Sequence, residues 1–197
     1  MAIPYFDAHC DTPVPVHFVP GKLRRNGFHL DLERLSAYAP CAQVFAVCVR
    51  HGERMVEETE NVVRTFLREL DENRDRVRLC LNASDLARAA AEKKLAALLS
   101  VEGADRLGDS VAGLRRFSAL GVRIVHLTWN DDTALCGAAL GSGGGLTPAG
   151  RDFVKAAQDM GVALDLSHCS EQGFWDVLEY AEKPVLAGHS DAMEVCW

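Results

Sequence analysis

The sequence of 197 residues predicts an α/β fold with a parallel sheet, in a single domain that covers residues 1–197. Short apolar runs alternate with amphipathic segments along the whole chain, as in strands that are joined by crossover helices. Several of these runs are apolar at successive positions, which is typical of parallel strands buried on both faces. Since no linker, repeat or run of charge divides the chain, one domain is expected.

Six apolar runs are predicted to be strands. In chain order they cover residues 5–11, 41–50, 95–102, 121–129, 162–168 and 184–189. Helices are predicted between them, at residues 53–72, 84–94, 107–117, 148–160 and 171–178. Thr147 and Ser170 are the expected N-caps of the last two helices, because their hydroxyls can accept a backbone N–H. Ser84 or Asp85 is expected to cap the second. Residues 13–26 and 131–145 are predicted to be long loops.

The composition predicts a soluble globular protein, because 48% of the residues are apolar and 25% are charged. The net charge of −7 and the scattered basic residues argue against nucleic acid as a partner. The apolar runs are too short to span a membrane, and the first residues do not resemble a signal peptide, so we expect a cytoplasmic protein. The seven cysteines form no C-x-x-C pair and are expected to be free, buried thiols.

The first predicted strand carries three candidate metal ligands, Asp7, His9 and Asp11. Side chains two residues apart on a strand point to the same side, so these three are expected to line up together. An imidazole and a carboxylate at a strand end can form half of a metal site. A solvated strand end followed by a helix cap is an equal alternative for this segment alone.

Three further ionisable side chains each follow an apolar run. Glu102 follows residues 98–101, His168 follows 162–167 and His189 follows 185–188. The carboxyl ends of parallel strands lie at one edge of a sheet, where α/β proteins build their sites. Any one of these residues by itself is better explained as a core residue or a cap. Four strand ends with such side chains together predict a metal centre.

The number of ligands predicts two divalent ions. His9 and Asp11 are expected to bind one ion, His168 and His189 the other, and Glu102 is expected to bridge both. Two ions about 3.5–4 Å apart can share a water and lower its pKa enough to form hydroxide. Nitrogen and oxygen ligands favour Zn²⁺, with Mn²⁺, Co²⁺ or Fe²⁺ as alternatives.

Other notable residues are assigned supporting roles. Asp7 is expected to orient a ligand histidine. His126 lies within an apolar run and is expected to pack in the core. His17 and His29 are expected at the surface, with the mouth of the pocket as the less favoured alternative. The glycine run at 141–145 lacks the lysine and the spacing of a phosphate loop, so a flexible connection is expected.

Several motifs together resemble the membrane dipeptidase family, over essentially the whole length from Asp7 to Cys196. They are Asp7-Ala8-His9-Cys10-Asp11-Thr12, Val101-Glu102-Gly103, Leu127-Thr128-Trp129-Asn130, Gly145-Leu146-Thr147-Pro148-Ala149-Gly150, Asp165-Leu166-Ser167-His168, Gly173-Phe174-Trp175-Asp176-Val177-Leu178-Glu179 and Gly188-His189-Ser190. The resemblance implies a (β/α)₈ TIM-type barrel of the metal-dependent hydrolase kind, with about six strands present. It also implies a zinc-dependent hydrolase of dipeptides, often with a D-residue at the C-terminal side. The five ligands proposed above match the zinc ligands of the family.

Two features differ from the family pattern. The mammalian branch has a histidine that helps to bind the reacting carbonyl, and this chain has Trp129 there, which we assign to the substrate pocket. Family members also continue with about two more strands, an arginine that binds the substrate carboxylate and an aspartate that transfers a proton. The resemblance therefore implies a barrel that is incomplete at its C-terminal end, in a fragment, a truncated frame or a degenerate copy.

Three hypotheses about function follow. The first is a dipeptidase in which Glu102 positions the metal-bridging hydroxide that attacks the amide, with the activity of this chain left open. The second is another binuclear-metal amidohydrolase, which a substrate panel would distinguish from the first. The third is a non-catalytic remnant that binds metal or a partner. The expected partner is a dipeptide substrate, a homodimer is left open, and neither nucleic acid nor a membrane is expected.

Overall fold

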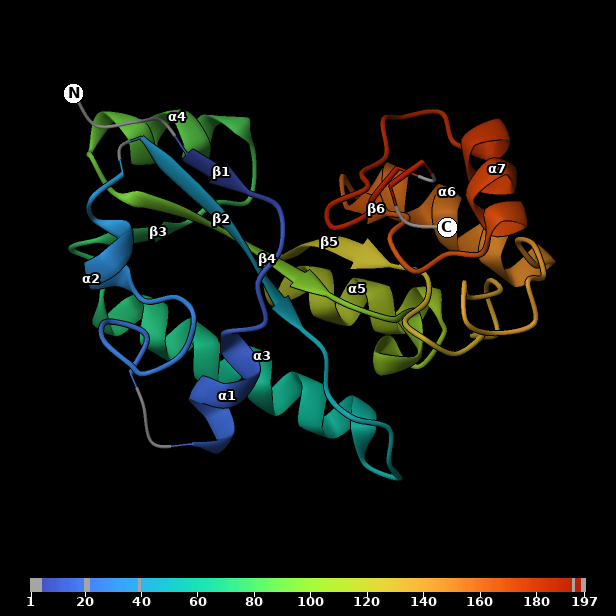
Figure 1. Ribbon diagram of the computed structural model, residues 1–197, viewed down its shortest axis with the longest axis horizontal. Helices are drawn as coiled ribbons and strands as arrows, with labels where there is room; N and C mark the ends of the chain where they lie inside the picture. The colour runs from blue at the N-terminus through green and yellow to red at the C-terminus, as the bar shows by residue number, and fades with distance from the viewer. Residues whose placement is uncertain (1–4, 20–21, 39, 193, 196–197) are drawn as a thin grey trace. The chain divides into compact units, whose positions relative to one another are not determined.

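Strands and helices alternate in the computed structural model, which describes residues 5–19, 22–38, 40–192 and 194–195 (Figure 1). The strands are β1 (Tyr5–Asp7), β2 (Cys41–Val47), β3 (Val77–Leu79), β4 (Leu95–Val101), β5 (Val122–His126) and β6 (Ala163–Asp165). Hydrogen bonds order them β1-β2-β4-β5-β6, and β3 also pairs with β4. The pairs β1–β2, β3–β4 and β5–β6 are parallel. The predicted α/β class with a parallel sheet is confirmed.

Helices follow most of the strands. They are α1 (Pro13–Phe18), α2 (Leu32–Leu35), α3 (Met55–Glu72), α4 (Ala83–Ala91), α5 (Val111–Ala119), α6 (Pro148–Asp159) and α7 (Glu171–Tyr180), with a short 3-10 helix η1 (Ala104–Leu107) after β4. Within the part of the chain that the structure describes, no helix combines the length and the apolarity that are needed to cross a membrane.

The chain divides into two compact units. Unit 1 comprises Met1–Ser100 and Ala119–Arg123, and unit 2 comprises Val101–Ser118 and Ile124–Trp197. The boundary passes through β4 and β5, so each of these strands contributes residues to both units. The organisation as a single domain stays a prediction.

The core of unit 1 lies between β2 and the long helix α3. Phe45 of β2 and Phe66 of α3 are fully buried, and their ring centroids are 4.8 Å apart. Helix α1 packs against α3, where the two ring nitrogens of His17 lie 2.8 Å from the Thr65 hydroxyl and 3.2 Å from a Glu58 oxygen. His17 therefore joins two helices, instead of lying free at the surface as predicted.

Unit 2 is organised by capped helices and a parallel strand pair. The hydroxyl of Thr147 accepts the N–H of Gly150 at the start of α6, and Ser170 accepts the N–H of Gly173 at the start of α7. Both predicted caps are confirmed, and both satisfy N–H groups that a helix leaves unpaired in its first turn. The parallel register of β5 and β6 pairs Ile124 with Ala163 and so aligns the ends of these strands.

The structure differs from the predicted set of strands at Val77–Leu79 and at residues 184–189. Strand β3 was not predicted, because its three residues are too few to show an alternating pattern. The segment 184–189 was predicted to be a strand but forms only an isolated parallel bridge, between Leu186 and Asp165. Its partner β6 has only three residues. Beyond the bridge, N–H groups of the segment bind side chains instead of a neighbouring backbone.

Three predictions near helix ends were wrong. The segment 13–26 was predicted to be a loop, yet its first residues form α1, because proline suits the first turn of a helix, where its missing N–H costs no hydrogen bond. Asn82, and neither Ser84 nor Asp85, caps α4. The helix predicted around 107–117 begins at Val111, since Leu107 ends η1.

Candidate metal centre

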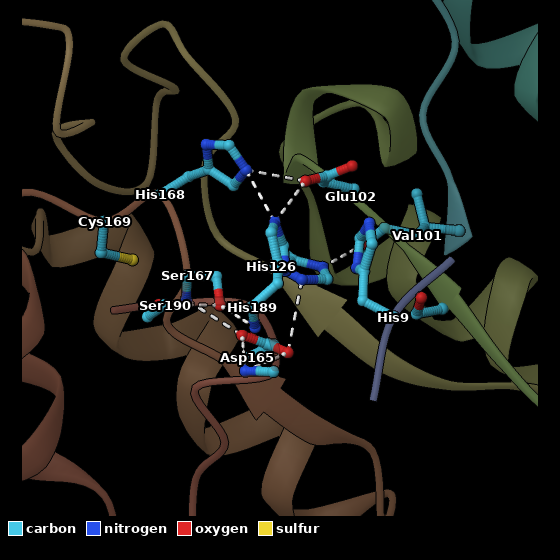
Figure 2. A network of polar contacts seen from close by, with 12 residues as sticks. His9, Val101, Glu102, His126, Asp165, Ser167, His168, Cys169, His189 and Ser190 are labelled. Atoms are coloured by element: carbon cyan, nitrogen blue, oxygen red, sulfur yellow. Dashed lines mark hydrogen bonds and ion pairs between the residues drawn. The ribbon is translucent and has the colours of Figure 1, made fainter. Parts of the chain in front are cut away.

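Three of the predicted ligands converge in unit 2 (Figure 2). Glu102 directly follows β4, while His168 and His189 lie in the loops after β6 and after the Leu186 bridge. Glu102 Oε1 lies 2.9 Å from His168 Nε2 and 3.2 Å from His189 Nε2, and the two imidazole nitrogens are 2.9 Å apart. One carboxylate oxygen and two ring nitrogens therefore point at a common centre.

The chemistry of this donor set fits a divalent cation. Glu102 is buried, with 3% of its surface exposed, and a buried carboxylate needs a cation or hydrogen-bond donors around it. Zn²⁺ ligands stand about 2.0–2.1 Å from the metal and therefore roughly 3.3 Å from each other in a tetrahedral site. The distances among Glu102, His168 and His189 are close to that spacing, so these residues fit a zinc ion.

His168 is held in an unusual backbone conformation. Its φ angle is +71°, in the left-handed region that residues other than glycine rarely adopt. The carbonyl of His168 accepts the N–H of Ala139, and the side chain turns toward Glu102. Such strain occurs preferentially at functional sites, because the surrounding structure must maintain it.

His126 has a different role from the one predicted. It is fully buried, as expected for a core residue, but its ring takes part in a polar network (Figure 2). Nε2 lies 3.4 Å from Asp165 Oδ2 and Nδ1 lies 3.4 Å from the carbonyl of Val101. Ligand atoms of Glu102, His126 and His189 lie within 4.8 Å of one another. The position of His126 at the end of β5 was the signal that sequence reasoning missed.

Asp165 forms the other half of this network and is also buried. Burial by itself would raise the pKa of its carboxyl, but the hydrogen bond and the charge of His126, with the N–H of Ser167, hold that pKa well below the usual range. Oδ1 accepts the N–H of Ser167 at 2.9 Å and that of Gly188 at 3.1 Å. The carboxylate is therefore ionised and well satisfied inside unit 2.

The predicted ligands His9 and Asp11 lie in unit 1. His9 Nε2 is 3.6 Å from Asp11 Oδ1, and Asp7 Oδ1 accepts the backbone N–H of His9 at 3.2 Å. The strand ends at Asp7, so the expected alignment of the three side chains along one strand is wrong. A bend at Ala8 follows the strand, and the backbone of Cys10 then bonds to Val44 and Ala46 in β2.

Trp129, the predicted pocket residue, is half-buried in unit 2. The guanidinium carbon of Arg106 lies 5.2 Å from the centroid of the Trp129 ring, which is within the range of a cation–π interaction. Arg106 is fully buried and also pairs with Asp105 at 2.9 Å. Arg106 thus packs against the indole, and the assignment of Trp129 to the substrate pocket stays a prediction.

The two thiols beside the candidate ligands differ, because a hydrogen bond with the Cys136 thiol lowers the pKa of Cys169, whereas Cys10 is governed by burial. Burial raises the pKa of the Cys10 thiol to about 12, so it stays protonated near neutral pH. Cys169, next to His168, accepts the hydroxyl of Thr128 at 3.8 Å. The six cysteines among the described residues are free, and Cys196 lies outside those residues. The prediction of free thiols is confirmed for these six.

The whole chain matches a known protein family. The model of the membrane dipeptidase family (Peptidase family M19) matches residues 1–197. The chain is 31% identical to Dipeptidase tcpJ of Claviceps purpurea (strain 20.1), over 94% of this chain and 46% of that protein.

Solved structures show the same fold. A metallopeptidase from Rhodobacter sphaeroides, liganded with a phosphinate mimic of the dipeptide L-Ala-D-Ala, has a TM-score of 0.87 and 26% identity, and the match covers 99% of this chain and 67% of that one. The probable dipeptidase PvdM from Pseudomonas aeruginosa has a TM-score of 0.85 and 21% identity, over 98% and 53% of the two chains. The chain therefore spans about half to two thirds of the length of these three proteins. The chain has an α/β fold that corresponds to part of a TIM-type barrel.

Proposed function

Because the chain belongs to the membrane dipeptidase family, we propose that it acts as a metal-dependent dipeptidase that binds two zinc ions. The observation that carries the proposal is the convergence of Glu102, His168 and His189, whose ligand atoms are separated by 2.9–3.2 Å.

Each proposed ligand has a distinct task. His168 and His189 would provide imidazole nitrogens for one ion, His9 and Asp11 would provide a nitrogen and an oxygen for the other, and the two carboxylate oxygens of Glu102 would be available to both. Bound zinc ions supply Lewis acidity, which activates water and polarises the amide carbonyl. The buried position of Glu102 favours this role, because its negative charge is weakly screened there.

The proposed substrate is a dipeptide with a D-residue at its C-terminal side. The Rhodobacter sphaeroides metallopeptidase, which shares the fold, binds a mimic of L-Ala-D-Ala. We assign Trp129 to the wall of the substrate pocket, where its indole offers an apolar surface that Arg106 holds in place.

The proposed location is the cytoplasm. Six described cysteines are free, which suits a reducing compartment. A homodimer is one possible oligomeric state of this protein, and size-exclusion chromatography of the purified protein would measure it.

Metal analysis and ligand binding test the proposal together. Purified protein is dialysed against zinc and its metal content is measured, and two ions per chain are expected. Binding of the phosphinate mimic of L-Ala-D-Ala and hydrolysis of L-Ala-D-Ala are then followed with and without a chelator. Zinc-dependent binding of the mimic supports a dipeptidase site. Zinc-loaded protein that neither binds the mimic nor hydrolyses the dipeptide would contradict it, and hydrolysis of other amides alone would favour a different amidohydrolase.

A further inference from the structure

His126 and Asp165 form a buried pair that none of the proposed ligand roles uses. They are direct partners in the parallel register of β5 and β6, so their side chains extend on the same face of the sheet. His126 Nε2 lies 3.4 Å from Asp165 Oδ2, and their side chains are each 1% exposed. Burying a charged pair is costly unless it is well bonded, so the contacts around it are informative.

The pair contacts the backbone immediately before each of the three ligands in unit 2. His126 Nδ1 lies 3.4 Å from the carbonyl of Val101, the residue before Glu102. Asp165 Oδ1 accepts the N–H of Ser167, the residue before His168, at 2.9 Å. Both oxygens of Asp165 lie 3.1 Å from the N–H of Gly188, the residue before His189.

Ser167 extends this network to His189. Its hydroxyl accepts the backbone N–H of His189 at 3.1 Å and the hydroxyl of Ser190 at 3.1 Å. The loop 188–190 follows an isolated bridge instead of a full strand, so these side-chain bonds replace the ladder bonds that would otherwise place it. Figure 2 shows Asp165 and Ser167 beside the loop that carries His189.

From these contacts we propose that His126 and Asp165 are positioning residues, which hold Glu102, His168 and His189 in the geometry that binds metal. The inference rests on the proposed function, because it takes those three residues as ligands. It differs from a ligand role for His126, since both ring nitrogens of His126 face protein oxygen atoms. Outer-shell partners of this kind typically change metal affinity about 10- to 100-fold when they are removed.

Cobalt binding provides a test that is independent of enzyme activity. Metal-free wild type and the Asp165→Asn variant are titrated with Co²⁺, and the visible absorption of the bound ion is recorded. Asparagine is nearly the same size but is uncharged and has only one acceptor oxygen. We expect Co²⁺ to bind the variant roughly 10- to 100-fold more weakly, with an altered spectrum that reports changed ligand geometry.

A matched control separates positioning from general stability. Asp31→Asn makes the same change at another buried aspartate, which caps α2 and pairs with Arg34 at 2.9 Å. Both variants are compared with the wild type by thermal unfolding without metal. Asp31→Asn is expected to lower the unfolding temperature and to leave the affinity for Co²⁺ and the spectrum unchanged.

A second variant keeps the test decisive if Asp165→Asn does not fold. His126→Gln retains a hydrogen-bond donor toward Asp165, so it is expected to weaken Co²⁺ binding less than His126→Ala. In the double variant His126→Ala/Asp165→Asn, the fold-decrease in Co²⁺ affinity is expected to be smaller than the product of the decreases in the two single variants. The reason is that the two residues act as a unit.

The outcomes distinguish this inference from the proposed function. Wild type that binds no Co²⁺ would contradict the metal site itself. Wild type that binds Co²⁺, with folded Asp165→Asn and His126→Ala variants of the same affinity and spectrum, would overturn the positioning role and leave the metal site standing.

Discussion

The two groups of predicted ligands differ in how they are held. His9 and Asp11 in unit 1 are two residues apart in the sequence, their facing atoms are 3.6 Å apart, and the Asp11 side chain is 62% exposed. In unit 2, Glu102 and His168 are 66 positions apart in the sequence, yet their facing atoms are 2.9 Å apart and the Glu102 side chain is only 4% exposed. One group is local and has an exposed carboxylate, and the other is distant in sequence and has a buried carboxylate.

This difference indicates how much of each group is organised before metal arrives. The unit 2 residues are fixed by hydrogen bonds to the backbone around them, so little entropy is lost when an ion binds. Asp11 must give up its freedom in solvent when it binds an ion, which costs affinity. We therefore expect the unit 2 residues to contribute more to metal affinity than the unit 1 residues.

The largest effect is expected from Glu102→Gln. The change removes the charge of the proposed bridging ligand, so both ions should be lost, with an affinity decrease greater than the roughly 100-fold that outer-shell changes reach. Zinc content after dialysis and calorimetric titration measure it. Glu60→Gln is the control, since Glu60 is also buried and pairs with Arg64 at 2.6 Å. An equal loss of zinc in both variants would argue against a special role for Glu102.

A smaller effect is expected from Asp11→Asn. Asparagine keeps one oxygen that can bind metal but lacks the charge, so one of the two ions should bind about tenfold more weakly while the other is retained. Titration with zinc should then show two unequal steps. Asp159→Asn is matched in exposure, since Asp159 has a side chain that is 65% exposed and lies in α6. If Asp11→Asn loses both ions, the unit 1 residues matter more than we infer.

The smallest effect concerns stability, in a part of unit 1 that is not proposed to bind metal. Burial would raise the pKa of Asp31, but the N–H groups of Arg34 and Asn26 and the Arg34 guanidinium together lower it. A lowered pKa means that the ionised carboxylate stabilises the folded state above the ordinary aspartate pKa of about 3.9, and that this contribution is lost as the pH falls through the lower pKa of the folded state.

Urea unfolding of wild type and Asp31→Asn across this pH range measures that contribution. The variant should be less stable by up to about 1 kcal/mol at neutral pH, because asparagine can still cap the helix but lacks the charge that pairs with Arg34, and the difference should shrink toward zero in acid. A difference that grows as the pH falls would contradict the assigned cause. These urea unfolding measurements are made without zinc, so that metal binding does not contribute to the measured stability.

Much of the local structure was predictable, because its signals lie within a few residues. Thr147 and Ser170 were recognised as caps because the hydroxyl of a residue just before a helix can accept the backbone N–H three residues later. Apolar runs located β2 and β4, which are buried on both faces. The failures were also local: β3 is too short to show a pattern, and α1 begins at prolines that were interpreted as a loop.

The sequence by itself determined which residues stand at the ends of the strands, and therefore that Glu102, His168 and His189 were candidates. Only the tertiary structure decided how these three residues meet. It also showed that His126, which was assigned to the core, lies near Glu102 and His189 and contacts Asp165. The physical reason is the register of β5 and β6, which pairs His126 with Asp165. Parallel strands are joined by a long crossover, so their register pairs residues that are distant in the chain, and the pattern of one strand alone does not show which residues will face each other.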